Sequence, residues 1–223
     1  MQESIGIAIT TRNRKESFNL VKSKITEFMP DNSFLFCIDD ASDIPYANPC
    51  FRFDERVGIP KVKNKCLELL ILSAGVDHLF LFDDDCYPLT KDWHIPYVNS
   101  PYNLMCYTWY NPIHNDGTHK YHLKGHGCMM YINKSIVESI GGFDTTFGLG
   151  KYEHTAYFER SYNAGLVPYP FIDAINSNKL FHSMDEHGEI DRSFSSEENS
   201  KLLKDNLSHY NKTKNDKYFI PYI

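Results

Sequence analysis

The first half of the chain alternates short apolar runs with segments whose apolar residues recur at helical spacing. The runs predict buried strands at residues 5–9, 33–38 and 78–82. Between these strands, helices are predicted from two apolar sets, Phe18, Val21, Ile25 and Phe28, then Val62, Cys66, Leu69 and Leu70. Pro60 stands where the first turn of the second helix accepts a proline. This order predicts a parallel sheet with helices on its faces.

The second half is less regular and predicts fewer elements. Strands are predicted at residues 103–109 and 127–132, on either side of a polar loop rich in histidine. Asn133 can cap a short helix that Gly141 and Gly142 end, and a longer helix is predicted over residues 152–163. The polar tail after residue 193 contains one amphipathic helix, marked by Leu202, Leu203 and Leu207.

The composition is that of an ordinary globular protein. The 223 residues are 42% hydrophobic and 23% charged, which predicts one domain over residues 1–223 with a substantial core. The longest apolar stretch, at residues 67–74, is far short of the roughly 20 residues that span a bilayer. No signal-peptide pattern opens the chain and the six cysteines form no C-x-x-C pair, so we expect a cytoplasmic protein with reduced thiols.

Charge narrows the choice of partners. The net charge of −6 argues against a broad surface that binds polyanions, although a local basic groove is compatible with that sum. The candidates for such a groove are Lys120, Lys124, Lys201 and Lys204.

A run of three aspartates, Asp83-Asp84-Asp85, follows directly on the apolar strand of residues 78–82. Adjacent carboxylates repel one another, and a hard cation such as Mn²⁺ or Mg²⁺ resolves the repulsion by binding one or two of them together with phosphate oxygens. The other interpretation is a solvated acidic turn. The buried strand that leads into the run favours a metal site.

Polar clusters also end the other two strands. Residues 10–14, of sequence TTRNR, follow the first strand, and residues 39–42, of sequence DDAS, end the second. Ligands of parallel sheets bind beyond the carboxyl ends of the strands, so these clusters are expected to converge on one crevice. A carboxylate there can accept hydrogen bonds from a base N–H or from ribose hydroxyls, whereas taken alone Asp and Ser are also common turn formers.

A third polar segment runs from Gly141-Gly142-Phe143-Asp144 to Glu153, His154 and Arg160. A carboxylate in the first turn of a helix, as at Glu153, is often favoured only by the helix dipole. The functional interpretation is a base that deprotonates an acceptor hydroxyl.

Together these segments resemble the GT-A glycosyltransferases, closest to family 2, with features of the galactosyltransferase-like families, over roughly residues 5–165. The resemblance implies an α/β fold. In it, a Rossmann-like nucleotide-binding half with a mixed, mainly parallel sheet (about residues 1–100) is fused to an acceptor-binding half (about residues 101–223). It also implies transfer of a sugar from a nucleotide diphosphate sugar, most readily a UDP-sugar, to an acceptor hydroxyl, dependent on Mn²⁺ or Mg²⁺ and with inversion.

The resemblance assigns roles to individual residues. The donor side is expected to comprise Thr10, Arg12, Asp39, Asp40, Arg56, Lys63, Asp83 and Asp84, with Lys63 where arginine is usual. Asp83 and Asp85 match the D-x-D metal motif, and His182 lies where these enzymes often place a third ligand; His187 and a purely structural role are the alternatives. The usual E-D pair here is Glu153-His154, so either can be the base, and Glu153 is preferred.

The histidine-rich loop allows a different metal. His114, His119, His122 and His126 suggest zinc, but no cysteine accompanies them and their spacing fits no standard site. The preferred interpretation is a loop that faces the acceptor.

Two other functions fit parts of the pattern. A nucleotidyltransferase shares the fold class and the metal, but it normally carries a glycine-rich loop after the first strand, and residues 10–15 contain no glycine. A catalytically inactive module that binds a sugar nucleotide or a glycan would fit the change from E-D to Glu153-His154.

The acceptor is a bacterial surface glycan by default. The alternative is a phage-type enzyme that acts on hydroxymethylated DNA bases in the host cytoplasm, which would use a local basic groove. The sequence leaves the oligomeric state open.

Overall fold

The computed structural model describes residues 4–45, 50–190 and 194–223. Its strands and helices, in chain order, are β1 (Ile5–Thr11), α1 (Lys15–Glu27), β2 (Ser33–Asp39), β3 (Phe51–Arg52), α2 (Ile59–Glu68), β4 (His78–Asp83), β5 (Cys86–Pro88), α3 (Ile95–Val98), β6 (Leu104–Cys106), β7 (His114–Asn115), β8 (His119–His122), β9 (Met129–Asn133), α4 (Lys134–Ile140), α5 (Glu153–Asn163), β10 (Phe171–Ala174), β11 (Phe181–Ser183) and α6 (Ser196–Thr213).

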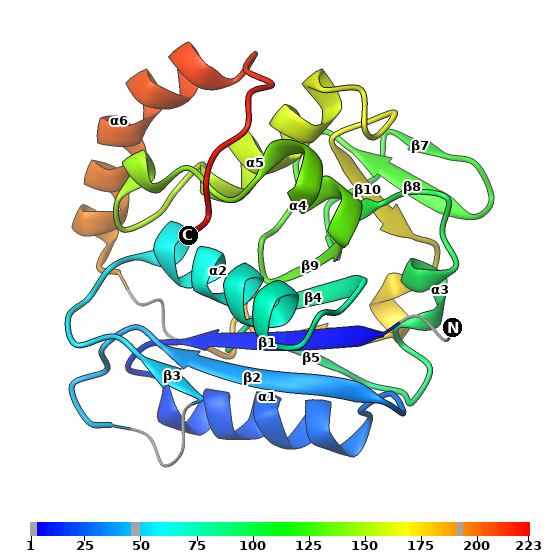
Figure 1. Cartoon of the computed structure of the whole chain (residues 1–223), viewed down its shortest axis with the longest axis horizontal. Helices are drawn as coiled ribbons and strands as arrows, with labels where there is room; N and C mark the ends of the chain where they lie inside the picture. Colours follow the sequence, from blue (N-terminus) through cyan, green and yellow to red (C-terminus); the bar gives the residue numbers. More distant parts are fainter. Residues whose placement is uncertain (1–3, 46–49, 191–193) are drawn as a thin grey trace.

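A six-stranded sheet in the order β3-β2-β1-β4-β9-β6 forms the centre (Figure 1). Strands β3, β2, β1 and β4 are parallel, whereas β9 runs antiparallel to both of its neighbours, β4 and β6. The predicted α/β class with a mixed, mainly parallel sheet is therefore confirmed.

Alternation along β1 builds a core on each face of this sheet. Ile5, Ile7 and Ile9 pack in a cluster with apolar residues of α1, while Ala8 belongs to a second cluster with α2, α4 and α5. The close approach of the second layer requires Gly6, since a Cβ there would lie 2.5 Å from Leu70 Cδ2. Helices on both faces thus hold β1 and β4 in the middle of the molecule (Figure 1).

The long elements lie close to their predicted positions, and the short ones differ. The strand predicted at residues 103–109 is only Leu104–Cys106, and the histidine-rich loop contains a hairpin of β7 and β8, which β10 extends to a three-stranded sheet. Strands β5 and β11 form a separate pair. These strands have two to four residues each, too few for a periodic apolar pattern to mark them.

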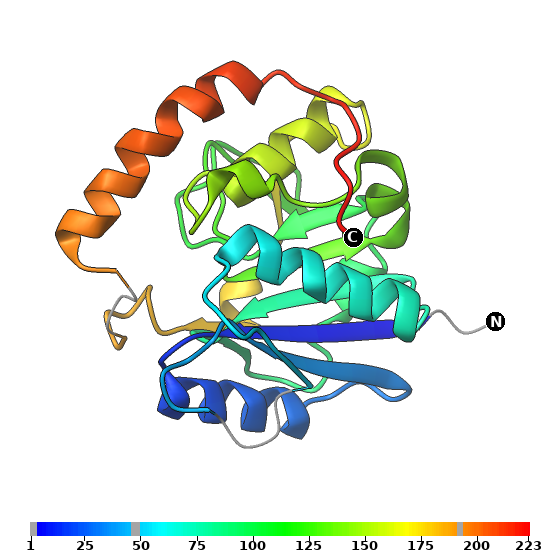
Figure 2. The ribbon, with the colours of Figure 1, turned by 60° about the vertical axis from the view of Figure 1, so that its left-hand side comes forward.

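The predicted tail helix is α6, and it lies on the outside of the molecule. Figure 2 shows α6 along one side and the following segment running back towards α4. No residue of α6 is buried. The tail is fixed by backbone hydrogen bonds, Gly142 N to Ile220 O (2.7 Å) and Ile220 N to Ile140 O (3.0 Å). Among the described residues, no helix has the length and apolarity needed to cross a membrane.

Candidate active site

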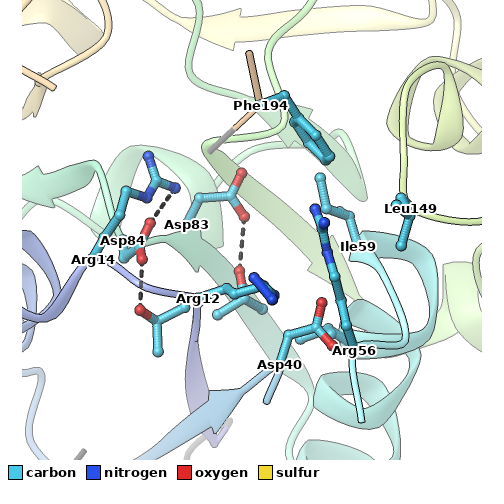
Figure 3. A pocket seen from close by; sticks show the side chains of 12 residues that line it. Arg12, Arg14, Asp40, Arg56, Ile59, Asp83, Asp84, Leu149 and Phe194 are labelled. Atoms are coloured by element: carbon cyan, nitrogen blue, oxygen red, sulfur yellow. Dashed lines mark hydrogen bonds and ion pairs between the residues drawn. The ribbon is translucent and has the colours of Figure 1, made fainter. Parts of the chain in front are cut away.

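The carboxyl ends of β1, β2 and β4 meet at a small cavity of about 80 Å³ (Figure 3). Because residues that the sequence analysis expected on the donor side line it, we call it the donor cavity. Its walls are Thr10, Thr11, Arg12, Arg14, Asp40, Arg56, Ile59, Val62, Asp83, Asp84, Leu149 and Phe194. The polar clusters that end the three strands therefore converge, as the sequence predicted. Phe194 completes the wall opposite the strands, with the Arg56 guanidinium 4.8 Å from its ring centroid.

The three aspartates take different positions because side chains alternate where the strand ends. Asp84 points inward and is fully buried; Thr11 Oγ1 donates to it (2.6 Å) and Arg14 forms an ion pair with it. Burial, opposed by Arg14, raises the pKa of Asp84 to about 7. Arg14 also pairs with Asp85 at 3.4 Å. Asp84 thus holds the turn, and its carboxylate is already occupied by protein groups.

Asp83 and Asp85 form the outward pair. Asp83 lines the donor cavity and also a second, larger cavity, which Asp85 shares. Thr10 Oγ1 donates to Asp83 Oδ1 (2.9 Å). The buried Oδ1 of Asp85 has no hydrogen-bond partner among the described residues, and burial together with Asp83 raises the pKa of Asp85 to about 6. Two crowded carboxylates, one with an unpaired oxygen, are a donor set that fits a hard divalent cation.

No group of three His, Cys, Asp or Glu side chains in the described part of the chain is arranged to hold a metal ion. The predicted third ligand, His182, has its Nε2 2.7 Å from Glu189 Oε2 and its ring stacked on Tyr87 and His187. A carboxylate that the sequence analysis missed, Asp185, lines the larger cavity with Asp83 and Asp85.

The two aspartates after β2 also differ in position. Asp40 lines the donor cavity as predicted, where it accepts hydrogen bonds from the backbone N–H groups of Val57 (2.7 Å) and Gly58 (3.1 Å). Asp39 lies apart from the lining of that cavity: it is fully buried, accepts from Ser42 Oγ (2.6 Å) and pairs with Arg52. Its carboxylate closes the turn, so the structure does not place it against a nucleotide.

Lys63 also differs from its predicted position, because it lies beneath the site. The side chain is 1% exposed; its Nζ donates to Gly127 O (2.6 Å) and lies 3.2 Å from Asp83 Oδ1. Burial disfavours the charged ammonium, but Asp83 and Glu153 outweigh it and raise the pKa of Lys63. Lys63 is therefore a buried counter-ion between the aspartates and α5.

The larger cavity, of about 570 Å³, is also lined by Asp83. Because Glu153 and His154, the bases that the sequence analysis expected for the acceptor, line it, we call it the acceptor cavity. One wall is aromatic: the His126 ring stacks between Trp109 (centroids 3.5 Å apart) and Tyr110 (4.3 Å). Another wall includes Leu203 and Tyr210 of α6. His126, one of the four histidines of the loop that was expected to face the acceptor, lies at this cavity. The other three stand apart from the cavity lining, which does not support a zinc site.

Glu153 and His154, the candidate bases, lie together in the acceptor cavity. His154 Nδ1 is 3.1 Å from Glu153 Oε1; the His154 side chain is 24% exposed and that of Glu153 only 5%. Burial opposes ionisation of Glu153, but the hydrogen bond from His154 and the charges of His154 and Lys63 outweigh it and lower its pKa to about 2. Gly127 leaves room for the His154 ring, since a Cβ at Gly127 would lie 3.2 Å from Cγ of that ring.

Solved structures with a similar fold are glycosyltransferases. A mannosyltransferase from Pyrobaculum calidifontis, in complex with GDP-Man and Mn²⁺, has a TM-score of 0.52 at 17% identity over 73% of this chain and 52% of its own. The catalytic domain of Drosophila β1,4-galactosyltransferase 7, with xylobiose, has a TM-score of 0.52 at 14% identity over 90% and 79%. GalNAc-T7, with UDP, GalNAc and Mn²⁺, has a TM-score of 0.60 at 12% identity over 76% and 42%.

The fold is that of the GT-A glycosyltransferases. The chain spans about half the length of the mannosyltransferase and less than half of GalNAc-T7, so it corresponds to part of those proteins. No family model matches its sequence. No curated protein matches it in sequence either. In this GT-A fold the donor and acceptor cavities meet at Asp83.

Proposed function

We propose that the protein is a metal-dependent glycosyltransferase that moves a sugar from a nucleotide diphosphate sugar to an acceptor hydroxyl with inversion. The observation that carries the proposal is the position of Asp83, whose side chain lines the donor cavity and the acceptor cavity alike. The reacting groups of a donor and an acceptor would then meet beside the same carboxylate.

On the donor side, the nucleotide would contact four side chains that line the donor cavity, those of Thr10, Arg12, Asp40 and Arg56. A UDP-sugar is the favoured donor, as the resemblance to family 2 implies. Asp83 and Asp85 would hold Mn²⁺ or Mg²⁺, which stabilises the negative charge that develops on the diphosphate leaving group. Within the run of three aspartates, Asp84 is held by its ion pair with Arg14, which leaves Asp83 and Asp85 for a cation.

On the acceptor side, Glu153 and His154 act as a pair. With Glu153 ionised, the contact to His154 Nδ1 requires a proton on that nitrogen, which leaves Nε2 as the ring atom that can accept a further proton. We propose that His154 takes the proton of the acceptor hydroxyl and that Glu153 fixes its tautomer and stabilises the imidazolium. A base on the acceptor side suits direct displacement in one step, which inverts the anomeric carbon.

The acceptor we propose is a glycan. The wall of Trp109, His126 and Tyr110 gives the acceptor cavity an apolar, flat side next to polar groups, the arrangement common in small-molecule sites. The carboxylates of Asp83, Asp85, Asp185, Glu153 and Glu159 outnumber the ammonium groups of Lys124 and Lys151 around it. A neutral acceptor therefore suits this cavity better than a polyanion does.

The decisive experiment is a panel of nucleotide sugars with and without Mn²⁺. A ligand that binds only the folded state raises the melting temperature, so the true donor should stabilise the protein more with Mn²⁺ than without it. The same mixtures should release free sugar slowly. A melting shift without any sugar release would instead favour an inactive binding module, and a requirement for a nucleoside triphosphate would favour a nucleotidyltransferase.

A further inference from the structure

The backbone just before Glu153 is held in an unusual conformation. Lys151 and Tyr152 have φ angles of 77° and 70°, in the left-handed region that side chains other than glycine rarely adopt. Tyr152 is the N-cap residue of α5, so this conformation sets the direction in which Glu153 and His154 enter the acceptor cavity. Strain of this kind persists only when surrounding contacts hold it in place.

The same loop, residues 147–152, connects the two cavities. Leu149 lines the donor cavity, whereas Lys151 and Tyr152 line the acceptor cavity. The loop also lies tightly on the start of α2: a Cβ at Gly58 would come within 2.2 Å of Gly148 O. The loop therefore contributes side chains to both cavities.

One side chain of α6 spans this loop. Asn206 Nδ2 donates to the carbonyl oxygens of Phe147 (2.9 Å) and Gly150 (2.7 Å), with that of Lys151 at 3.4 Å. Core packing does not account for the attachment of α6, because none of its residues is buried. The neighbouring contacts also reach towards the site, since Tyr210 stacks on Tyr152 with ring centroids 4.7 Å apart.

We infer that Asn206 is a positioning residue for the transfer reaction. Its amide donates hydrogen bonds to carbonyl oxygens of the loop and so holds Lys151 and Tyr152 in the left-handed conformation. That conformation directs Glu153 and His154 into the acceptor cavity. Asn206 touches neither cavity and acts through the loop. The inference rests on the proposed function for its catalytic part, whereas the restraint on the loop is independent of it.

The test compares Asn206→Ala with Asn211→Ala, an exposed asparagine on the same helix for which the structure shows no side-chain hydrogen bond. Amide hydrogen exchange is measured at Gly148 and Gly150, whose N–H groups donate to Thr145 O (3.0 Å) and Phe147 O (3.1 Å). Loss of two good hydrogen bonds should speed exchange at these amides about tenfold in Asn206→Ala. Exchange in β1 and β4 should stay unchanged, and Asn211→Ala should behave as the wild type.

Kinetic measurements distinguish a role of Asn206 in positioning the catalytic groups from a purely structural contact. With Mn²⁺ and the donor found in the panel, kcat for sugar release should fall about tenfold in Asn206→Ala while the KM for the donor stays within about twofold. Asn206→Gln, which keeps an amide donor on a longer stem, should recover part of the loss in both measurements. These variants should fold, since the mutated helix contributes nothing to the core.

The outcomes that would overturn the inference are distinct from a failure of the proposed function. Unchanged exchange at Gly148 and Gly150 in Asn206→Ala removes the restraint itself. Faster exchange with unchanged kcat, or equal effects in Asn211→Ala, leaves Asn206 as a structural contact only. If the wild type releases no sugar from any donor, the proposed function fails, the positioning role falls with it, and the exchange data still decide whether the loop is restrained.

Discussion

In the run of three aspartates at the end of β4, neighbouring carboxylates differ in what they face. The strand alternation turns Asp84 towards Thr11 and Arg14, which satisfy its carboxylate, and turns Asp83 and Asp85 towards the acceptor cavity. The sequence predicted that acids gather at this edge, but it could not say which carboxylates stay available. That depends on partners brought from β1 and from the turn after it.

The outward pair can be tested at Asp85. Asp85→Asn removes one candidate ligand and also relieves repulsion with Asp83, so the metal-free protein should melt at the same or a slightly higher temperature. The additional stabilisation by Mn²⁺ together with the donor should disappear, and turnover should fall about 10²-fold or more. Asp92→Asn, an exposed carboxylate outside both cavities, serves as the control and should change neither quantity. Normal turnover in Asp85→Asn would refute the metal assignment.

The pairing of Glu153 with His154 predicts a pattern in two variants. His154→Ala should lower the transfer rate about 10²–10⁴-fold, since it removes the base. Glu153→Gln should cause a loss of similar size because a neutral amide no longer holds the proton on Nδ1. Donor KM should change little in both. If the transfer rate fell sharply in Glu153→Gln but stayed near normal in His154→Ala, Glu153 itself would be the base, as the sequence favoured. Normal transfer rates in both variants would exclude α5 from the chemistry.

Glu153 should also make stability depend on pH. Its pKa is lowered from 4.5 to about 2, so the folded state keeps the carboxylate ionised more firmly than the unfolded chain does. A depressed folded-state pKa contributes stability that is complete above about pH 4.5 and is lost as the pH falls towards 2. Urea titrations of the wild type and Glu153→Gln between pH 6 and pH 3 measure this contribution. The difference in free energy of unfolding should stay level to about pH 5 and then shrink; a growing difference would contradict an ionised Glu153.

At the scale of elements, periodicity predicted what long apolar segments form and missed what short contacts form. Helices α1, α2, α4 and α5 and strands β1, β2, β4 and β9 carry clear apolar faces, and the sequence located them. Strands β7, β8, β10 and β11 depend on pairing with distant partners, which no local pattern records. The same limit explains Lys63: the local pattern placed it on α2, but only its tertiary contacts with Gly127 O and Asp83 show that it is buried.

Lys63 is therefore expected to link two elements through charge. Lys63→Met leaves Asp83 and Glu153 without their shared cation and should cost about 2 kcal/mol of stability. This is less than for a wholly buried pair, because the Asp83 side chain is 26% exposed. Mn²⁺ should restore part of the loss by neutralising Asp83, which chemical denaturation with and without Mn²⁺ can measure. Lys65→Met, which breaks only a peripheral pair with Glu68, is the control. An equal loss in both variants would remove the special role of Lys63.

At the scale of the whole molecule, the parts of the site come from segments far apart in the chain. The donor cavity joins β1 with Leu149 and Phe194, and the acceptor cavity joins Asp83 with residues of α6. The sequence predicted the edge of the sheet at which this occurs, because alternating strands and helices imply parallel strands, whose carboxyl ends lie at one edge. It did not predict that α6 would form a wall, since an exposed amphipathic helix has the same pattern wherever it lies.

The counter-ions Arg14 and Lys63 have a consequence for handling the protein. They offset most of the negative charge of the three aspartates from within the fold. A preparation stripped with a chelator should therefore stay folded, unlike small domains whose fold depends on a structural zinc ion. Different divalent ions could then be loaded into one stock and compared directly. In a cell, the identity of the bound ion would then depend on the concentrations of the available divalent ions as well as on the geometry of the site. When metal is scarce, the metal-free protein would stay folded and able to bind an ion later.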